Sequence, residues 1–130
     1  MPDPGRVRVK ICGVTRPEDA AACEAAGADA IGLIFAPRSR RRLGVVRAAE
    51  VAAGAGPFLT RVGVFQDADE DEILAAVEAA RLDAVQLHGG EPDALAERLR
   101  RRVRVVRALR FEPGVTPEAL AGRPHDAVLL

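Results

Sequence analysis

Residues 7–18 read VRVKICGVTRPE, and this stretch contains the pattern that decides the fold. It opens with an apolar run rich in β-branched residues, as strands are. A glycine follows, and then Thr15 and Glu18 have the spacing of a helix capping box, with Pro17 in the first helical turn. A strand, a glycine turn and a helix start in immediate succession predict one strand–helix unit.

The same succession recurs along the whole chain. Six short runs rich in Val, Ile or Leu are the predicted strands, and they cover residues 7–12, 30–35, 59–65, 84–88, 103–109 and 127–130. The segments between them are rich in Ala, Glu, Arg and Leu, which favour helix. Further helix starts are predicted at the acidic residues 69–72, at residues 91–92 and at residues 116–118, and Gly27 is a predicted helix end. The alternation predicts an α/β fold of parallel strands joined by right-handed helical crossovers.

Length and composition narrow the class of protein. The chain has 130 residues, a formal net charge of zero and 48% hydrophobic residues, which suits one domain, residues 1–130, without an internal linker. The balanced charge argues against a nucleic-acid or membrane-surface partner. The start lacks the features of a signal peptide, and no apolar run reaches the roughly 18–20 residues of a membrane span. Cys12 and Cys23 are therefore interpreted as reduced thiols of a cytoplasmic protein.

Polar residues interrupt two of the predicted strands. Side chains alternate between the two faces of a strand, so Lys10 and Cys12 share one face, and Gln86 and His88 share one face of the fourth predicted strand. The opposite faces hold Val7, Val9 and Ile11 in the first strand and Val85 and Leu87 in the fourth. If these apolar residues pack beneath the helices, the four polar side chains point into the centre of the sheet or barrel.

These side chains also lie at the catalytic end of such a fold. Cys12 and His88 each precede a glycine at the carboxyl end of a parallel strand, where α/β enzymes place their chemistry. A simpler interpretation remains open for each, because a strand-end cysteine is often a small buried hydrophobe and a lone histidine is often structural. Cys23, on the alanine-rich first helix, is expected to pack in the core. The cysteines and histidines lack zinc-ligand spacing, and no nucleotide-binding fingerprint is present, so no metal or cofactor is predicted.

A basic loop follows the second predicted strand. Residues 37–42 read PRSRRR. The loop could be an ordinary solvated charge run, and a nucleic-acid patch is less favoured because no aromatic residues accompany it. At the carboxyl end of a parallel strand, however, an arginine fork suits a carboxylate or a phosphate.

Several of these stretches resemble one enzyme family. Residues 9–16, 27–35, 37–41, 61–65 and 85–89 with Glu91 are similar, in order and at family spacing, to the phosphoribosylanthranilate isomerases of tryptophan biosynthesis. The Lys-Ile-Cys-Gly and Gln-Leu-His-Gly runs are the most specific, and the resemblance covers nearly the whole chain. It implies a (β/α)8 TIM-barrel fold, of which about the first six strands and five helices are present.

The resemblance also implies a reaction and its residues. The reaction is a cofactor-free Amadori rearrangement of N-(5′-phosphoribosyl)anthranilate, a phosphorylated small molecule. Cys12 would be the general base, with Lys10 as a neighbouring charge, and Arg41 would hold the anthranilate carboxylate. The implied substrate-binding residues are Arg41, Gln86, His88, Lys10 and Arg61.

One family residue has no counterpart in the 130 residues. The general acid is an aspartate ending the sixth strand, and here residues 126–130 read DAVLL, so the matching aspartate would follow Leu130. Asp126 begins the strand, roughly 13 Å from that end, and cannot substitute. The last two strand–helix units are missing as well. We therefore expect this chain to be inactive alone or to need its C-terminal part.

Six strands cannot close an eight-stranded barrel, so the first and sixth would leave open apolar edges. We expect self-association, or completion by a separate polypeptide. The alternative class is a catalytically silent half-barrel or assembly module. A different phosphate-binding barrel, of the indole-glycerol-phosphate type, lacks its signature residues here.

Overall fold

Six parallel strands form one sheet in which every strand pairs with its neighbours in sequence, in the order β1-β2-β3-β4-β5-β6. The computed structural model describes residues 5–130. The strands are β1 (Lys10–Cys12), β2 (Ala30–Ile34), β3 (Thr60–Phe65), β4 (Ala84–Leu87), β5 (Arg104–Ala108) and β6 (Ala127–Leu129). The helices between them are α1 (Pro17–Ala25), α2 (Val45–Ala53), α3 (Glu70–Ala80), α4 (Asp93–Leu99) and α5 (Pro117–Ala121). The predicted alternation is confirmed.

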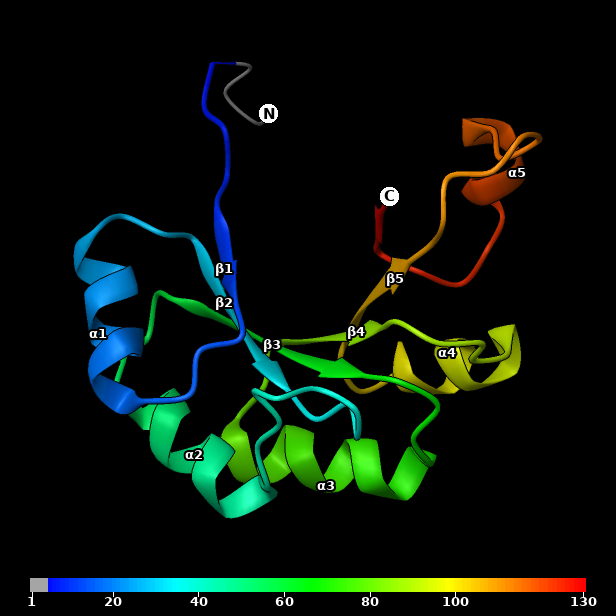
Figure 1. The fold of residues 1–130 in the computed structure, drawn as a ribbon. Helices are drawn as coiled ribbons and strands as arrows, with labels where there is room; N and C mark the ends of the chain where they lie inside the picture. The colour runs from blue at the N-terminus through cyan, green and yellow to red at the C-terminus, as the bar shows by residue number, and fades with distance from the viewer. Residues whose placement is uncertain (1–4) are drawn as a thin grey trace.

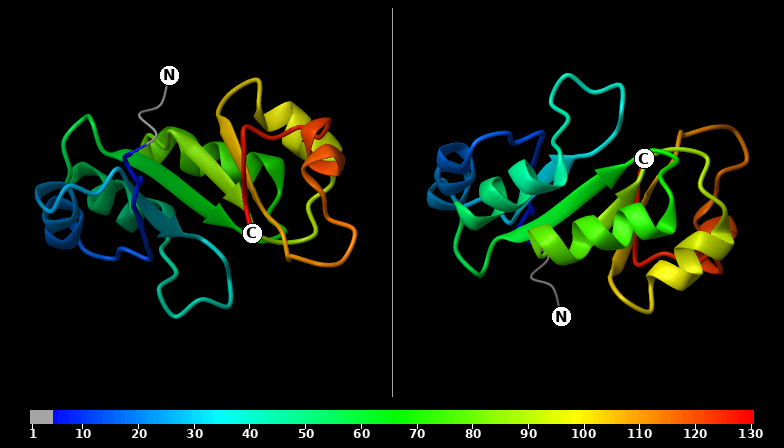
Figure 2. Two further views of the ribbon diagram at one scale, coloured as in Figure 1. Left: turned by 90° about the horizontal axis from the view of Figure 1, so that it is seen from above. Right: turned by 90° about the horizontal axis from the view of Figure 1, so that it is seen from below.

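The sheet curls into a partial barrel with its helices outside. Helices α1, α2 and α3 lie next to one another along the outer face, and α4 continues the row beneath β4 and β5 (Figure 1). Seen from above, the strands lie in front of these helices, and seen from below, the helices lie in front of the strands (Figure 2). Among the described residues, no helix is both long and apolar enough to cross a membrane. The arrangement is that of a (β/α) barrel of the TIM type, represented by six strands and five helices.

The core lies between the sheet and these helices. Apolar side chains that point outward from the central strands are fully buried, as Ile31, Leu33, Phe65, Val85 and Val105 show. They meet small residues of the helices, such as Ala48 and Ala76, which allow the helix backbones to approach the sheet closely. Cys23 packs against this core as a free thiol, as predicted.

The outer face of β1 departs from the prediction. Val7, Val9 and Ile11 are exposed by 82%, 44% and 42%, so the expectation that they pack beneath helices is wrong. The physical reason is the course of α1, which packs against β2 and α2 and so leaves β1 uncovered.

The helix ends follow the sequence signals in part. Thr116 caps α5, because its Oγ1 accepts a hydrogen bond from the Ala119 N–H at 3.1 Å. Gly27 lies just beyond the end of α1, as predicted. The capping box at Thr15 is wrong, because Arg16 is the N-cap residue and no side chain among the described residues caps this end.

An aspartate stands directly before each even-numbered strand. Each carboxylate accepts a backbone N–H at 2.8 Å from within or just before the preceding strand, in the pairs Asp29 with Val9, Asp83 with Arg61 and Asp126 with Val105. The contact holds the first residues of two neighbouring strands at a fixed offset. This repeated link therefore helps to set the parallel register at the amino-terminal end of the sheet.

The Asp126 link predicts a pH dependence of stability. Burial raises the pKa of the Asp126 carboxyl, but the Val105 N–H and the Arg100 guanidinium outweigh it and hold the pKa below the usual 3.8. A depressed pKa means that the stabilisation is complete above the unfolded-state value and is lost as the pH falls through the folded-state value. Urea unfolding from about pH 5 downward should show a shallower loss of stability in Asp126→Asn than in the wild type.

Arg100→Met serves as the graded control. It keeps the hydrogen bond from Val105 and removes the ion pair at 3.2 Å, so its pH slope should lie between those of the wild type and Asp126→Asn. Identical slopes in all three proteins would show that Asp126 does not contribute.

Candidate functional site

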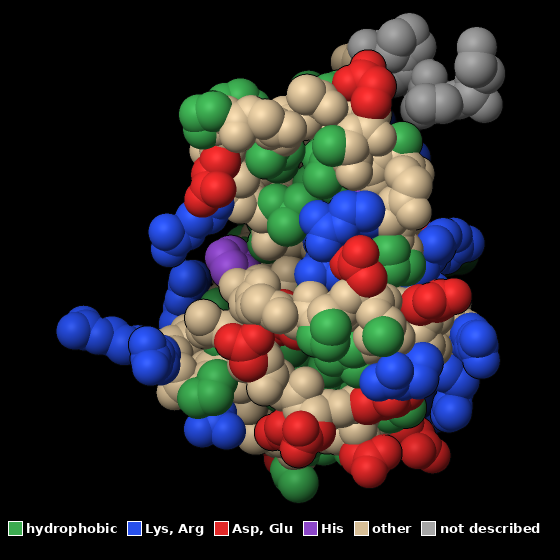
Figure 3. Space-filling view, turned by 90° about the vertical axis from the view of Figure 1, so that its right-hand side faces the viewer, with side chains coloured by type: hydrophobic (Ala, Val, Ile, Leu, Met, Phe, Trp, Pro, Cys, Tyr) green, Lys and Arg blue, Asp and Glu red, His purple; other side chains and the backbone are tan. Residues whose placement is uncertain are grey.

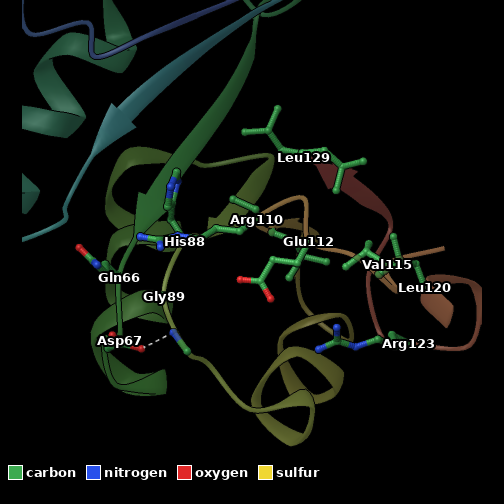
Figure 4. A pocket seen from close by; sticks show the side chains of 14 residues that line it. Gln66, Asp67, His88, Gly89, Arg110, Glu112, Val115, Leu120, Arg123 and Leu129 are labelled. Carbon is green, nitrogen blue, oxygen red and sulfur yellow. Dashed lines mark hydrogen bonds between the residues drawn. The ribbon is translucent and has the colours of Figure 1, made fainter. Parts of the chain in front are cut away.

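A cleft opens on the inner face of the sheet, at the carboxyl ends of the strands. Its first part, about 410 Å³, is bounded by β1, β3, β4, β6 and the loop after β2. Its second part, about 890 Å³, lies between the loops that follow β4 and β5. Both parts are lined by Gln66, His88 and Leu129, so they adjoin one another, and we call the two together the carboxyl-end cleft. His88 and Gly89 lie on one side of the second part, and Val115 and Leu120 lie on the other (Figure 4).

The strand register brings four of the predicted residues together. Lys10, Cys12, Gln86 and His88 all line the first part of the cleft. Cys12 pairs in register with Gly32, and a Cβ atom added to Gly32 would lie 2.8 Å from the Cys12 sulfur. The glycine therefore leaves the space that the thiol occupies. The four side chains therefore share one surface, as the strand alternation predicts.

Three of these side chains form a polar chain across the cleft floor. The Lys10 Nζ donates a hydrogen bond to Gln86 Oε1. The Gln86 Nε2 lies 3.4 Å from His88 Nδ1. Gln86 is only 3% exposed, so its amide depends on these two partners for hydrogen bonding.

Arg41 reaches the same cleft from the loop after β2. Its guanidinium donates to the Cys12 carbonyl oxygen at 3.0 Å, and its backbone N–H donates to Ser39 Oγ at 3.1 Å. The guanidinium passes directly over Gly13, where an added Cβ would lie 2.2 Å from it. Gly13 has φ +84°, which other residues rarely adopt, so this turn requires glycine for two reasons. The contact places a cation at the rim beside Cys12.

Arg61 does not belong to the cleft. It follows the opposite parity, on the helix side of β3, and its guanidinium donates to the carbonyl oxygens of Ala52, Ala55 and Leu59 at 2.7–3.0 Å. These include carbonyls at the end of α2, which have no partner within the helix. The expectation of a substrate-binding Arg61 is therefore corrected, because its donors are used in holding α2 to the sheet.

A set of hydrogen bonds behind His88, which we call the brace, was not predicted from the sequence. Glu91 is 4% exposed, and its carboxylate accepts the N–H groups of Asp67 at 2.7 Å and Gly89 at 2.8 Å. The Asp67 carboxylate in turn accepts the Gly90 N–H at 2.8 Å (Figure 4). The brace ties the loop after β3 to the loop after β4. It therefore fixes the backbone immediately beyond His88.

Arg107 completes the support of this loop from β5. It is 4% exposed and donates to the Glu91 carbonyl oxygen at 2.5 Å and to Asp93 Oδ1 at 2.9 Å. Arg123 donates to the same Asp93 oxygen, and this hydrogen bond is the main cause that holds the pKa of Asp93 below its usual range. An arginine inside the predicted apolar strand 103–109 is the signal that could have revealed the cluster.

The surface charge around the α4 and α5 side is mixed. Figure 3 shows arginine or lysine side chains interspersed with aspartate and glutamate on this face. No large field of one sign forms there, which agrees with the zero net charge.

Parallel strands curled inside a row of helices, with polar side chains gathered at their carboxyl ends, define the class of (β/α)-barrel enzymes. The family model described as N-(5′-phosphoribosyl)anthranilate (PRA) isomerase matches residues 9–130. The chain belongs to this family.

Individual relatives agree with the family match. The N-(5′-phosphoribosyl)anthranilate isomerase of Ralstonia pickettii is 42% identical over 120 residues, which cover 91% of this chain and 52% of the relative. The isomerase of Deinococcus radiodurans is 40% identical over 142 residues, with 94% and 68% covered. Except for this longer match, the chain spans about half the length of the curated relatives it matches most strongly.

Solved structures share the fold. The phosphoribosyl anthranilate isomerase of Thermus thermophilus has a TM-score of 0.86 and 46% identity, with 94% of this chain and 60% of that chain covered. An isomerase in complex with reduced 1-(o-carboxyphenylamino)-1-deoxyribulose 5-phosphate has a TM-score of 0.78 and 40% identity, with 88% and 57% covered.

The placement of Arg61 predicts a stability effect. Arg61→Met removes several charge-assisted hydrogen bonds to part-buried carbonyl oxygens, so the free energy of unfolding should fall by about 1.5–3 kcal/mol. Urea unfolding measures the change. The matched control is Arg41→Met, whose exposed guanidinium makes a single hydrogen bond within residues 5–130, and it should cost less than about 1 kcal/mol. A larger loss in the control than in Arg61→Met would contradict this assignment.

Proposed function

We propose that this chain forms the Cys12 side of the active site of an N-(5′-phosphoribosyl)anthranilate isomerase, acting in tryptophan biosynthesis in the cytoplasm. The observation that carries the proposal is the convergence of Lys10, Cys12, Arg41, Gln86 and His88 on one cleft. The family match supports it, and so does the neighbour that binds a reduced carboxyphenylamino-deoxyribulose phosphate.

The reaction is an internal transfer of protons and electrons. A general acid protonates the ribose ring oxygen, the C1–O bond breaks, and the nitrogen lone pair forms a C1=N Schiff base. A general base then removes the C2 proton, and the electron pair moves to give an enolamine. Ketonisation transfers a proton to C1, so that C2 is oxidised and C1 reduced within one molecule. The atoms and electrons balance without a cofactor.

Cys12 is the proposed base for the C2 proton. Its thiol lies in the cleft beside Lys10, with room provided by Gly32. A thiol must be deprotonated to accept a proton. Cys12 is also exposed, so a substrate in the cleft can reach it.

Arg41 is the proposed ligand of the anthranilate carboxylate. A guanidinium suits a carboxylate because its planar fork of N–H groups can bind both oxygens. The hydrogen bond from one Arg41 nitrogen to the Cys12 carbonyl keeps the fork at the rim and leaves other donors for the substrate. The carboxylate would thus lie close to the reacting carbon.

The proposed general acid is an aspartate placed after Leu130. The register pairs Val106 with Ala127 and Ala108 with Leu129, and Leu129 lines the cleft. Alternation then points the residue after Leu130 into the cleft as well. Its carboxyl group would approach the substrate from β6, across the cleft from Cys12.

The edge strands β1 and β6 are the proposed places where further polypeptide completes the barrel. Each pairs with only one neighbour among the described strands. Ile11 and Leu129 are exposed there by 42% and 45%. Open backbone edges with apolar residues favour pairing with additional strands.

The edges predict association of the chain by itself. Sedimentation should show dimers or larger species at micromolar concentration, and adding a polypeptide that carries the family's last two strand–helix units should shift the chain into a discrete complex. A chain that sediments as a monodisperse monomer, with or without that polypeptide, contradicts the role of the edges.

Activity is tested by supplying these units. The chain is co-expressed with the part of the Thermus thermophilus neighbour that follows its sixth strand, from the aspartate through the sixth helix to the last two strand–helix units. Conversion of N-(5′-phosphoribosyl)anthranilate is followed by chromatography. We expect turnover, and Cys12→Ala should lower kcat by about 10²–10⁴-fold because the base is lost. The matched control is Cys23→Ala, the other cysteine of the chain, which lies on α1 and should leave turnover near the wild-type value.

Equal activity of Cys12→Ala and Cys23→Ala would remove the thiol from the mechanism. A folded complex without turnover, in which the wild type also fails to bind the reduced product analogue, would reject the isomerase.

A further inference from the structure

We propose that Gln86 holds His88 in the tautomer whose proton is on Nε2. Lys10 fixes the orientation of the Gln86 side chain, so that the amide nitrogen faces His88. His88 is then a hydrogen-bond donor toward the substrate and not an acceptor of its proton. This inference deepens the proposed function and rests on it for the identity of the substrate. The tautomer itself follows from two contacts within the chain.

The first step fixes the amide of Gln86. A lysine ammonium has hydrogen-bond donors and no acceptor, so the Gln86 atom in contact with Lys10 Nζ must be the oxygen. Gln86 is 3% exposed and lies in the middle of the sheet, so solvent does not compete for its amide. The amide nitrogen is therefore on the opposite side.

The second step fixes the histidine ring. The Gln86 Nε2 is a donor only, and it lies 3.4 Å from His88 Nδ1. A hydrogen bond forms at this contact only if Nδ1 is the unprotonated, accepting nitrogen. In the neutral ring the proton must then be on Nε2.

The third step concerns what the cleft offers a ligand. Among the described residues, His88 Nε2 has no hydrogen-bond partner, and the side chain is exposed in both parts of the cleft. Lys10 uses one of its three N–H groups on Gln86 and lines the same space. Lys10 and His88 therefore present only donors, which suit the oxygen atoms of a ribose or phosphate group. Removal of the C2 proton is left to Cys12.

Solution NMR of the nitrogen-labelled chain tests the tautomer directly. His88 and His125 are the only histidines, so His125→Gln assigns the spectrum. In mildly alkaline solution, where histidine is neutral, His88 Nδ1 should give a pyridine-type signal and Nε2 a pyrrole-type signal. In Gln86→Glu the carboxylate can only accept, so Nδ1 should become the protonated nitrogen, with a change in tautomer ratio of at least about tenfold.

Two further variants provide a control and a second test of the tautomer. Gln66→Glu is the matched control, because Gln66 lines the same cleft without a hydrogen bond to His88, and it should leave the wild-type pattern. Lys10→Met removes the ammonium that orients the amide, so the two tautomers should mix even if Gln86→Glu fails to fold. A wild-type ring protonated on Nδ1, or a Lys10→Met spectrum identical to that of the wild type, overturns the proposal.

The outcomes separate this inference from the proposed function because no substrate is present in the NMR experiment. The predicted tautomers together with an inactive completed enzyme would count against the isomerase alone. An active enzyme with the opposite tautomer would count against the donor role of His88 alone. In an active enzyme, His88→Gln, whose amide can also donate, should retain at least tenfold more kcat/KM than His88→Leu.

Discussion

Parallel pairing in sequence order, combined with the two-residue alternation of side chains, is the constraint on which the rest of the structure depends. Because Lys10 pairs with Ala30 and Gln86 with Val106, the residues of one parity meet on the inner face of the curled sheet. A shift of one residue in any strand would exchange its buried and inner side chains. The aspartates before β2, β4 and β6 restrict such a shift, because each binds a backbone N–H within or just before the preceding strand.

Much of the site could be predicted from alternation alone, without knowledge of the packing. Polar residues at one parity in the first and fourth predicted strands identified Lys10, Cys12, Gln86 and His88, and the structure brings all four into one cleft. The error at Arg61 arose where the resemblance was followed and parity was not applied. In the third strand Arg61 has the parity of buried Phe65, and this would have placed it on the helix side.

Other features depend on which segments become neighbours in space, and this information is not local. Sequence signals gave Glu91 as part of a helix start, yet its carboxylate binds Asp67 and Gly89 from two loops. The exposure of Ile11 likewise follows from the packing of α1 against β2 and α2, which the alternating pattern of the first strand does not predict. Strand order is set by the alternation of elements, whereas loop contacts and helix placement need the packed chain.

The basic residues divide between support of the scaffold and a place in the cleft. Arg61 and Arg107 are placed where a planar fork can bind several carbonyl or carboxylate oxygens, and both support the scaffold. Lys10 is the only lysine among 19 basic residues, and it stands inside the cleft beside the thiol. A compact ammonium can contact a single amide oxygen and still direct its other N–H groups at a ligand, whereas a guanidinium is a larger planar group. The lysine therefore fits a position where one donor must orient a neighbour and leave the cleft open.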